Sequence, residues 1–334
     1  LQAPDDPWQL MDLVALQGLI AHQRGEWFER FHHELRRTQG RQRLATAVFD
    51  AHLCVAEYVL YGPVPYPELI ADTEELRRRA AQAGALRGVA FAAALIGEAA
   101  LMMGDLELAE QELTDAVALH RDIDASAGEA HSLQRLAEVR VAQGDLAGAR
   151  ALLQRALPLA RFSVMSMHLL QRVYATMIAA APDAAAARAA VDQAEATLGE
   201  TDHCSFCAVM LAVPAAIACA DVGDLEEARR HLAEGEASVA RWPSGSWAAA
   251  LHEVRAHLAR AEGRNDEARR LLDAATRSFM AAGHPLDARR CEDTLSRWAA
   301  HAEGRIGDHA VPVGAGDGAA AGPGGLHDTL GGPE

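Results

Sequence analysis

The residue types best suited to chemistry gather in the segment 203–207, which reads His-Cys-Ser-Phe-Cys, and Cys219 follows on the same expected helix. Two cysteines three positions apart at the start of a helix can have lowered thiol pKa values, because the positive end of the helix dipole favours a thiolate. Together with His203, Cys204 and Cys207 could therefore bind zinc or act as a redox switch.

A second interpretation of the same cysteines competes with the first. A four-ligand zinc site needs a further residue from elsewhere, and the sequence holds no second Cys-x-x-Cys. Cys204 and Cys207 could instead be small buried residues in an alanine-rich helix pair, since free cysteine is among the most buried residue types. The sequence favours this packing role, so no metal or other cofactor is expected, and His203, Cys204 and Cys207 are only candidate ligands.

Other catalytic signatures are missing from the sequence. It contains neither His-Glu-x-x-His nor Gly-x-Ser-x-Gly, and His252 and His257 are five positions apart, which does not align them on one helix face. All 31 basic residues are arginine, so a phosphate-binding loop with its lysine and a Schiff-base lysine are both excluded. We therefore expect that the chain is not an enzyme.

The elements that must position these residues follow a repeat with a period near 40. In each copy a glycine is followed by a residue that can cap a helix and, five positions after the glycine, by alanine. The glycine ends one helix in the left-handed conformation and the next residue caps the following helix, so the two helices are antiparallel neighbours. The copies begin at Gly104, Gly144, Gly223 and Gly263, with a divergent copy at Pro182.

Further positions keep the same register in every copy. In the copy at Gly144 they are Ala137, Ala149, Leu153 and Ala156, in the order small, small, large, small. Small residues let the two helices of a hairpin touch, and the aliphatic residue fills the space between hairpins. The pattern predicts an all-α superhelix, or solenoid, of about seven antiparallel hairpins closed by a C-terminal capping helix.

These positions resemble the tetratricopeptide repeat family, which has small residues at the eighth, twentieth and twenty-seventh positions of its repeat. The long period resembles the repeats of bacterial maltose-activator and LuxR-type transcriptional regulators. The resemblance implies a non-catalytic protein–protein interaction module in a bacterial regulatory system for transcription or signalling. The alternative is a ligand- or redox-sensing domain of a larger ATP-dependent LuxR-type regulator.

The family also implies a binding surface, because the first helix of each hairpin lines a concave groove. A protein or peptide partner is expected there. The residues at the family's groove positions are His131, Gln134, Glu138, Leu169, Arg172, Thr176, Met210, Val213, Ile217, Glu253, His257 and Arg260.

Composition divides the chain into three parts and limits its partners. Residues 1–84 are expected to form degenerate helical hairpins, 85–300 the regular solenoid with its capping helix, and 301–334 a disordered tail rich in Gly, Ala and Pro. The net charge of −16 disfavours direct nucleic-acid binding, and the arginine clusters are expected on solvated helix faces beside acidic residues. No membrane span is expected, and five irregularly spaced cysteines favour a cytoplasmic location.

Overall fold

The computed structural model describes residues 7–199, 204–242 and 245–307, and these residues form fifteen helices and no strand. The chain divides into two units, Leu1–Leu295 and Ser296–Glu334. The first unit holds nearly all of the helices, and the described part of the second is the end of the last helix. The expected all-α fold is confirmed.

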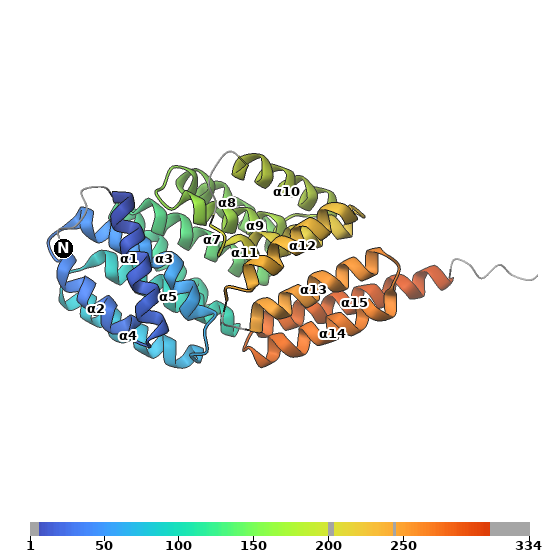
Figure 1. Cartoon of the computed structure of the whole chain (residues 1–334), viewed down its shortest axis with the longest axis horizontal. Helices are drawn as coiled ribbons and strands as arrows, with labels where there is room; N and C mark the ends of the chain where they lie inside the picture. The colour runs from blue at the N-terminus through green and yellow to red at the C-terminus, as the bar shows by residue number, and fades with distance from the viewer. Residues whose placement is uncertain (1–6, 200–203, 243–244, 308–334) are drawn as a thin grey trace, which may run out of the picture. The chain divides into compact units, whose positions relative to one another are not determined.

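The helices follow one another through short connections (Figure 1). In chain order they are α1 (Pro7–Gln23), α2 (Trp27–Thr38), α3 (Gln42–Leu60), α4 (Tyr66–Gln82), α5 (Leu86–Met103), α6 (Leu106–Asp122), α7 (Ser126–Ala142), α8 (Leu146–Arg161), α9 (Ser166–Ala179), α10 (Ala184–Leu198), α11 (Ala208–Asp221), α12 (Leu225–Val239), α13 (Gly245–Ala261), α14 (Asn265–Ala281) and α15 (Pro285–Gly307).

From α5 to α14 the chain forms five regular antiparallel hairpins, and α15 follows as the capping helix. The four N-terminal helices pack less regularly, since α1 lies mainly against α3 and α4 mainly against α5. A proline-rich turn separates α3 from α4, because proline cannot continue a helix. The last helix runs to Gly307, past the expected boundary at residue 300, and the expected tail from 308 to 334 lies outside the described residues.

The turn chemistry expected from the repeat is present. The four repeat glycines all adopt the left-handed conformation, with φ of 82° at Gly104 and Gly263 and 81° at Gly144 and Gly223. Four of the five repeat copies also have an aspartate whose side chain accepts a hydrogen bond from the first turn of the next helix, namely Asp105, Asp145, Asp183 and Asp224. In the copy at Gly263 the capping position is held by Arg264, which makes no such bond.

The register positions lie where helices touch. In the copy at Gly144, Ala137, Ala149 and Ala156 are fully buried, and Leu153 is 1% exposed. Gly97 holds the equivalent of Ala137 in the preceding copy, where a Cβ atom would come within 2.7 Å of the Leu113 side chain. The small residues therefore set the close approach of the two helices in a hairpin.

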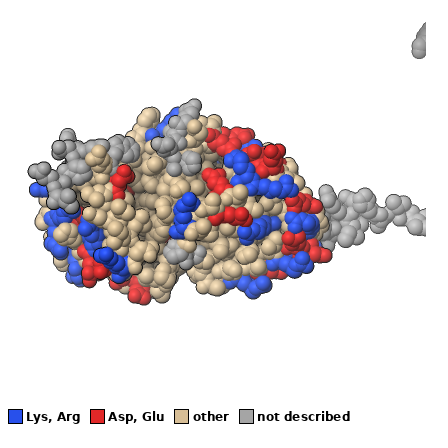
Figure 2. All heavy atoms as spheres, in the orientation of Figure 1, with Lys and Arg blue, Asp and Glu red and all other residues tan. Residues whose placement is uncertain are grey.

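Arginine clusters lie among acidic residues on the helix surfaces, as expected. Arg230 pairs with Glu227 one turn earlier on α12, and Arg77 pairs with Glu74 on α4. On the face drawn in Figure 2, basic and acidic side chains are interspersed rather than segregated. Exposed pairs of this kind contribute at most about 1 kcal/mol each, so they bear on solubility more than on stability.

Helix α5 (Leu86–Met103) is the one helix of the described residues with the length and apolar composition of a membrane span. In the fold, 78% of that stretch is buried. It packs between α4 and α6, and it carries the buried charged residues Arg87 and Glu98. Its apolar composition is that of a central core helix.

A buried histidine on α6 gives the fold an acid sensitivity. His120 accepts a hydrogen bond from Arg87 at 2.7 Å through Nε2, which leaves Nδ1 to donate to the Ser132 hydroxyl at 3.2 Å. Burial, the charge of Arg87 and nearby His131 together hold the pKa of His120 well below its usual value. Arg87 is itself paired with buried Asp50, so the whole group depends on a neutral His120.

We expect the free energy of unfolding to fall as the pH drops below about 6.5. In that range the unfolded chain binds a proton at His120 that the folded chain does not, and the loss reaches about 1.4 kcal/mol per pH unit. Urea unfolding between neutral and mildly acidic pH measures the effect. The His120→Gln variant is expected to have a shallower pH dependence than the wild type, whereas His33→Gln, at an exposed site, keeps the wild-type slope. Equal slopes in all three proteins would contradict the assignment.

Candidate functional site

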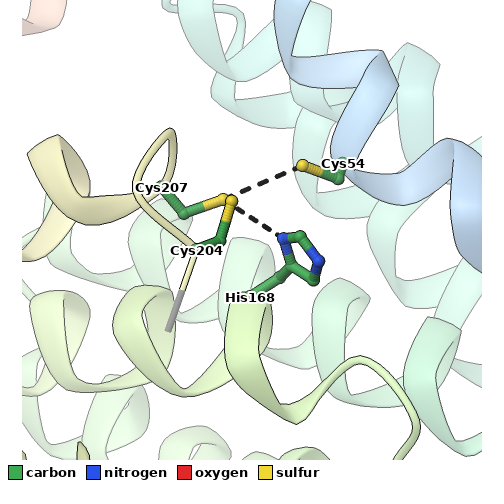
Figure 3. A group of neighbouring side chains, drawn as sticks. All are labelled: Cys54, His168, Cys204 and Cys207. Carbon is green, nitrogen blue, oxygen red and sulfur yellow. Dashed lines mark hydrogen bonds between the residues drawn. The ribbon is translucent and has the colours of Figure 1, made fainter. Parts of the chain in front are cut away.

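Four side chains that can bind a metal or react as thiols meet inside the first unit (Figure 3). Cys54 comes from the second half of α3, and His168 from the first turn of α9. Cys204 and Cys207 come from the segment just before α11, where Cys207 occupies the N-cap position. We call these four residues the thiol centre. It joins parts of the chain that are 153 residues apart in sequence.

The ligand atoms of the thiol centre converge on one small volume. The Sγ atom of Cys207 lies 3.9 Å from that of Cys54 and 3.6 Å from Nδ1 of His168. All four ligand atoms lie within 4.8 Å of one another. In Figure 3 the three sulfur atoms and the imidazole point toward one another. Such a set can bind a soft metal ion, and its thiols can also be oxidised or modified.

The thiols and the imidazole of the thiol centre shift one another's pKa values. A hydrogen bond with Cys207, followed by one with Cys54, lowers the pKa of the Cys204 thiol well below its usual value. The hydrogen bond with Cys204 raises the pKa of Cys54 instead. Burial opposes a charge on His168, but its hydrogen bonds to Cys204 and Cys207 raise its pKa to about 9. These pKa shifts favour negative charge at Cys204 and positive charge at His168.

Backbone and side-chain hydrogen bonds fix the segment that carries Cys204. Its N–H donates to the carbonyl of Met167 at 3.3 Å, and its carbonyl accepts from Nε2 of Gln171 at 3.1 Å. On the far side, the carbonyl of Phe206 accepts from Nε1 of Trp242 at 3.0 Å and from the hydroxyl of Ser238 at 3.1 Å. The segment is thus held to α9 on one side and to α12 on the other.

A small apolar pocket of about 130 Å³ leads to the thiol centre. Cys54, His168 and Cys204 form part of its wall. The rest is contributed by α1, α3, the residue before α9 and the segment before α11, through Met11, Asp12, Ala15, Leu19, Ala51, Val55, Tyr58, Met165 and Phe206. The pocket therefore offers a small reagent or ligand a space beside Cys54, His168 and Cys204.

The sequence singled out only half of this centre. Cys204 and Cys207 lie close together as predicted, whereas His203 falls outside the described residues. Cys54 and His168 carry no spacing signal, because each comes alone from a distant helix. Cys219 is fully buried on α11 away from the group, where burial raises its thiol pKa to about 11.

The expected partner groove is largely closed in this conformation. Eight of its twelve residues are buried, namely His131, Gln134, Leu169, Arg172, Thr176, Val213, Glu253 and His257. The other four, Glu138, Met210, Ile217 and Arg260, are partly buried. The first helices of successive hairpins contact one another, so the chain itself covers much of these side chains.

Ion pairs across the interior explain why the groove is closed. Glu57 of α3 is fully buried and binds Arg135 of α7 at 2.7 Å as well as Arg172 of α9. His131 of α7 likewise pairs with buried Glu98 of α5. Arg172 and His131, which the repeat pattern predicts to contact a partner, therefore pair with residues of this chain instead. Helix α3, from the irregular N-terminal part, supplies the central carboxylate.

The thiol centre and this ion-pair network meet at Arg172. Its Nη2 atom lies 4.0 Å from Sγ of Cys207, while Nη1 binds Glu57. A change of charge or position at Cys207 therefore affects the ion pair between Arg172 and Glu57, which links α9 to α3.

No family model matches the sequence, and no curated protein matches it. Among solved structures, the chain is similar to a Rap protein complexed with competence and sporulation factor, with a TM-score of 0.49 and 12% sequence identity. The similarity covers 89% of this chain and 88% of the Rap chain.

Proposed function

We propose that the chain is a non-catalytic regulatory module of helical repeats whose thiol centre senses a ligand or a redox change. The observation that carries the proposal is the meeting of Cys54, His168, Cys204 and Cys207 from three separate parts of the chain. Three thiols and an imidazole beside an apolar pocket form a group that can bind a ligand or change its redox state. The chemical state of the centre controls how firmly α3 is held against α9 and α11.

An aromatic cluster connects the thiol centre to the later repeats. Tyr58 lies one turn after Cys54 on α3, and its ring stacks on Trp242 with centroids 4.5 Å apart and planes at 14°. The Tyr58 ring also contacts the ring of Phe206, which lies between Cys204 and Cys207 in the sequence, with ring centroids 5.6 Å apart. A shift of α3 relative to the Cys204–Cys207 segment therefore changes this stack and the connection between α12 and α13.

A protein or peptide partner is the proposed recipient of the signal. Arg172 is buried against Glu57 of α3, so loosening α3 frees this groove residue for a partner. Partner binding would thereby depend on the thiol centre. The interspersed surface charges support a protein partner over nucleic acid. We place the module in the cytoplasm, in a bacterial regulatory system such as those of LuxR-type regulators.

Reversible thiol modification combined with hydrogen exchange tests this function. Methyl methanethiosulfonate converts a thiolate to its methyl disulfide and releases methanesulfinate, and dithiothreitol reverses the change. We expect modification at Cys204 to speed amide exchange in α3, α7 and α9, with recovery after reduction. Cys219 and Cys291, both fully buried, serve as internal controls that stay unmodified.

The matched variant Cys54→Ala/Cys204→Ala is expected to show no response to the reagent. Two results would refute a sensing role. One is modification of Cys204 with unchanged exchange in α3 and α9. The other is a Cys204 thiol that the reagent does not reach in the folded protein.

A further inference from the structure

We propose that the thiol centre binds one zinc ion through the sulfur atoms of Cys54, Cys204 and Cys207 and the Nδ1 atom of His168. The inference rests on the proposed function and deepens it, because it names the ligand of the same centre. It also replaces the sequence-based expectation that the chain holds no metal.

The spacing of the ligand atoms fits a tetrahedral zinc site. Zinc–sulfur bonds of about 2.3 Å and zinc–nitrogen bonds of about 2.0–2.1 Å place neighbouring ligands about 3.8 Å apart for two sulfurs and about 3.6 Å for sulfur and nitrogen. The corresponding distances are 3.9 Å from Cys207 to Cys54 and 3.6 Å from Cys207 to His168. No ligand pair is wider than 4.8 Å, so small side-chain shifts complete the tetrahedron.

The chemistry of the four ligands selects among metals. Three sulfurs and one imidazole nitrogen form a soft donor set, which disfavours magnesium and calcium because these ions take oxygen ligands. A set of four protein ligands also fills the coordination sphere of zinc, as in structural Cys₃His sites. The site therefore leaves no open position for a reacting water, in agreement with a non-catalytic role.

The surroundings of the centre suit a bound zinc ion. Zinc with three thiolates carries one net negative charge, and the Arg172 guanidinium beside Cys207 balances it. Gln171 and the backbone of Met167 hold the Cys204 segment, and Trp242 and Ser238 hold the carbonyl of Phe206. The ligands are thus held in place by hydrogen bonds before any ion binds.

A zinc ion at this place would stabilise the closed arrangement of the helices. It would tie α3 to α9, which the buried pair of Glu57 and Arg172 already joins, and it would tie both to the start of α11. Binding displaces the protons of the ligating thiols and the proton on Nδ1 of His168, and loss of the metal frees the thiols to react. Metal occupancy and thiol modification are therefore competing states of one centre.

The test measures metal in the full-length protein, purified under reducing conditions without chelators. We expect elemental analysis to find one zinc per chain. The variant Cys207→Ser should lose stoichiometric zinc, whereas Cys291→Ser, an equally buried cysteine outside the centre, should retain it. Circular dichroism establishes that both variants are helical.

Cobalt substitution of the wild type keeps the test decisive if a variant fails to fold. Cobalt(II) bound by three thiolates and one imidazole gives the intense visible bands of a tetrahedral site together with thiolate-to-cobalt charge transfer. A folded, reduced wild-type protein that holds no stoichiometric zinc and gives no such spectrum would overturn the inference. Stoichiometric binding of another metal, with zinc unable to displace it, would overturn the choice of ion.

The zinc site and the sensing function fail in different ways. If no metal binds but reversible modification of Cys204 still changes amide exchange in α3, the sensor stands without zinc. If zinc binds but its removal by a chelator leaves the exchange of α3 and α9 unchanged, the zinc site stands and the sensing function is lost.

Discussion

Ala149→Asp is expected to lower the free energy of unfolding by more than about 3 kcal/mol, because it places a carboxylate in a dry helix interface without a partner. Ala149 is fully buried on α8, in the main hydrophobic core. The small side chain at this repeat position lets α8 lie close to α7, so the larger residue also clashes. Urea unfolding followed by circular dichroism gives the value.

Ala151→Asp is the matched control, since it makes the same substitution at an exposed position of the same helix. It should lower the free energy of unfolding only by the lower helix propensity of aspartate relative to alanine, about 0.6 kcal/mol. The difference between the two variants then isolates burial at the repeat position. Equal stability of the two variants would show that the repeat register is misplaced.

Glu57→Gln is the second change with a large expected effect. It removes the carboxylate between Arg135 and Arg172 and leaves Arg172 with no other carboxylate among the ion pairs of the described residues. Both guanidinium groups are nearly fully buried, so we expect a loss of about 3–5 kcal/mol. The two arginines also hold the pKa of Glu57 below its usual range against the effect of burial, as expected for a carboxylate that folds in its charged form.

Glu110→Gln provides the comparison for this second change. Glu110 pairs with Arg140 at 2.6 Å, but both side chains are about one-third exposed, at 35% and 31%. Its loss should cost at most about 1 kcal/mol, since solvent screens the pair. If Glu57→Gln were as mild as Glu110→Gln, the buried network would not hold α3 to α7 and α9.

The repeat pattern was sufficient to predict the fold because its determinants are local. The left-handed glycines, the aspartate caps and the buried alanines act within one hairpin, so they leave a periodic trace in the sequence. Gly144, Asp145 and Ala149 illustrate this, since each does in the structure what its type predicts. The N-terminal helices lack this periodic pattern, so the sequence did not predict that α1 packs on α3.

The thiol centre could be predicted only in part because it is assembled by tertiary contacts. The spacing of Cys204 and Cys207 is visible in the sequence, but Cys54 of α3 and His168 of α9 reach them only through the tertiary fold. The closed groove has the same origin. Arg172 holds a groove position of the repeat, yet Glu57 of a distant helix neutralises and covers it. A repeat pattern describes contacts between neighbouring hairpins and carries no information on contacts across the interior.

The meeting of α3 with the Cys204–Cys207 segment is the central claim, and disulfide mapping tests it most directly. In the variant Cys204→Ser, the Cys54 and Cys207 thiols lie close enough to form a bond after a small movement. Brief oxidation with diamide, which takes up the two hydrogen atoms, followed by non-reducing peptide mapping is predicted to find Cys54 linked to Cys207, with Cys219 and Cys291 unlinked. A folded protein in which Cys54 stays free, or links to Cys219 or Cys291 instead, would contradict the account.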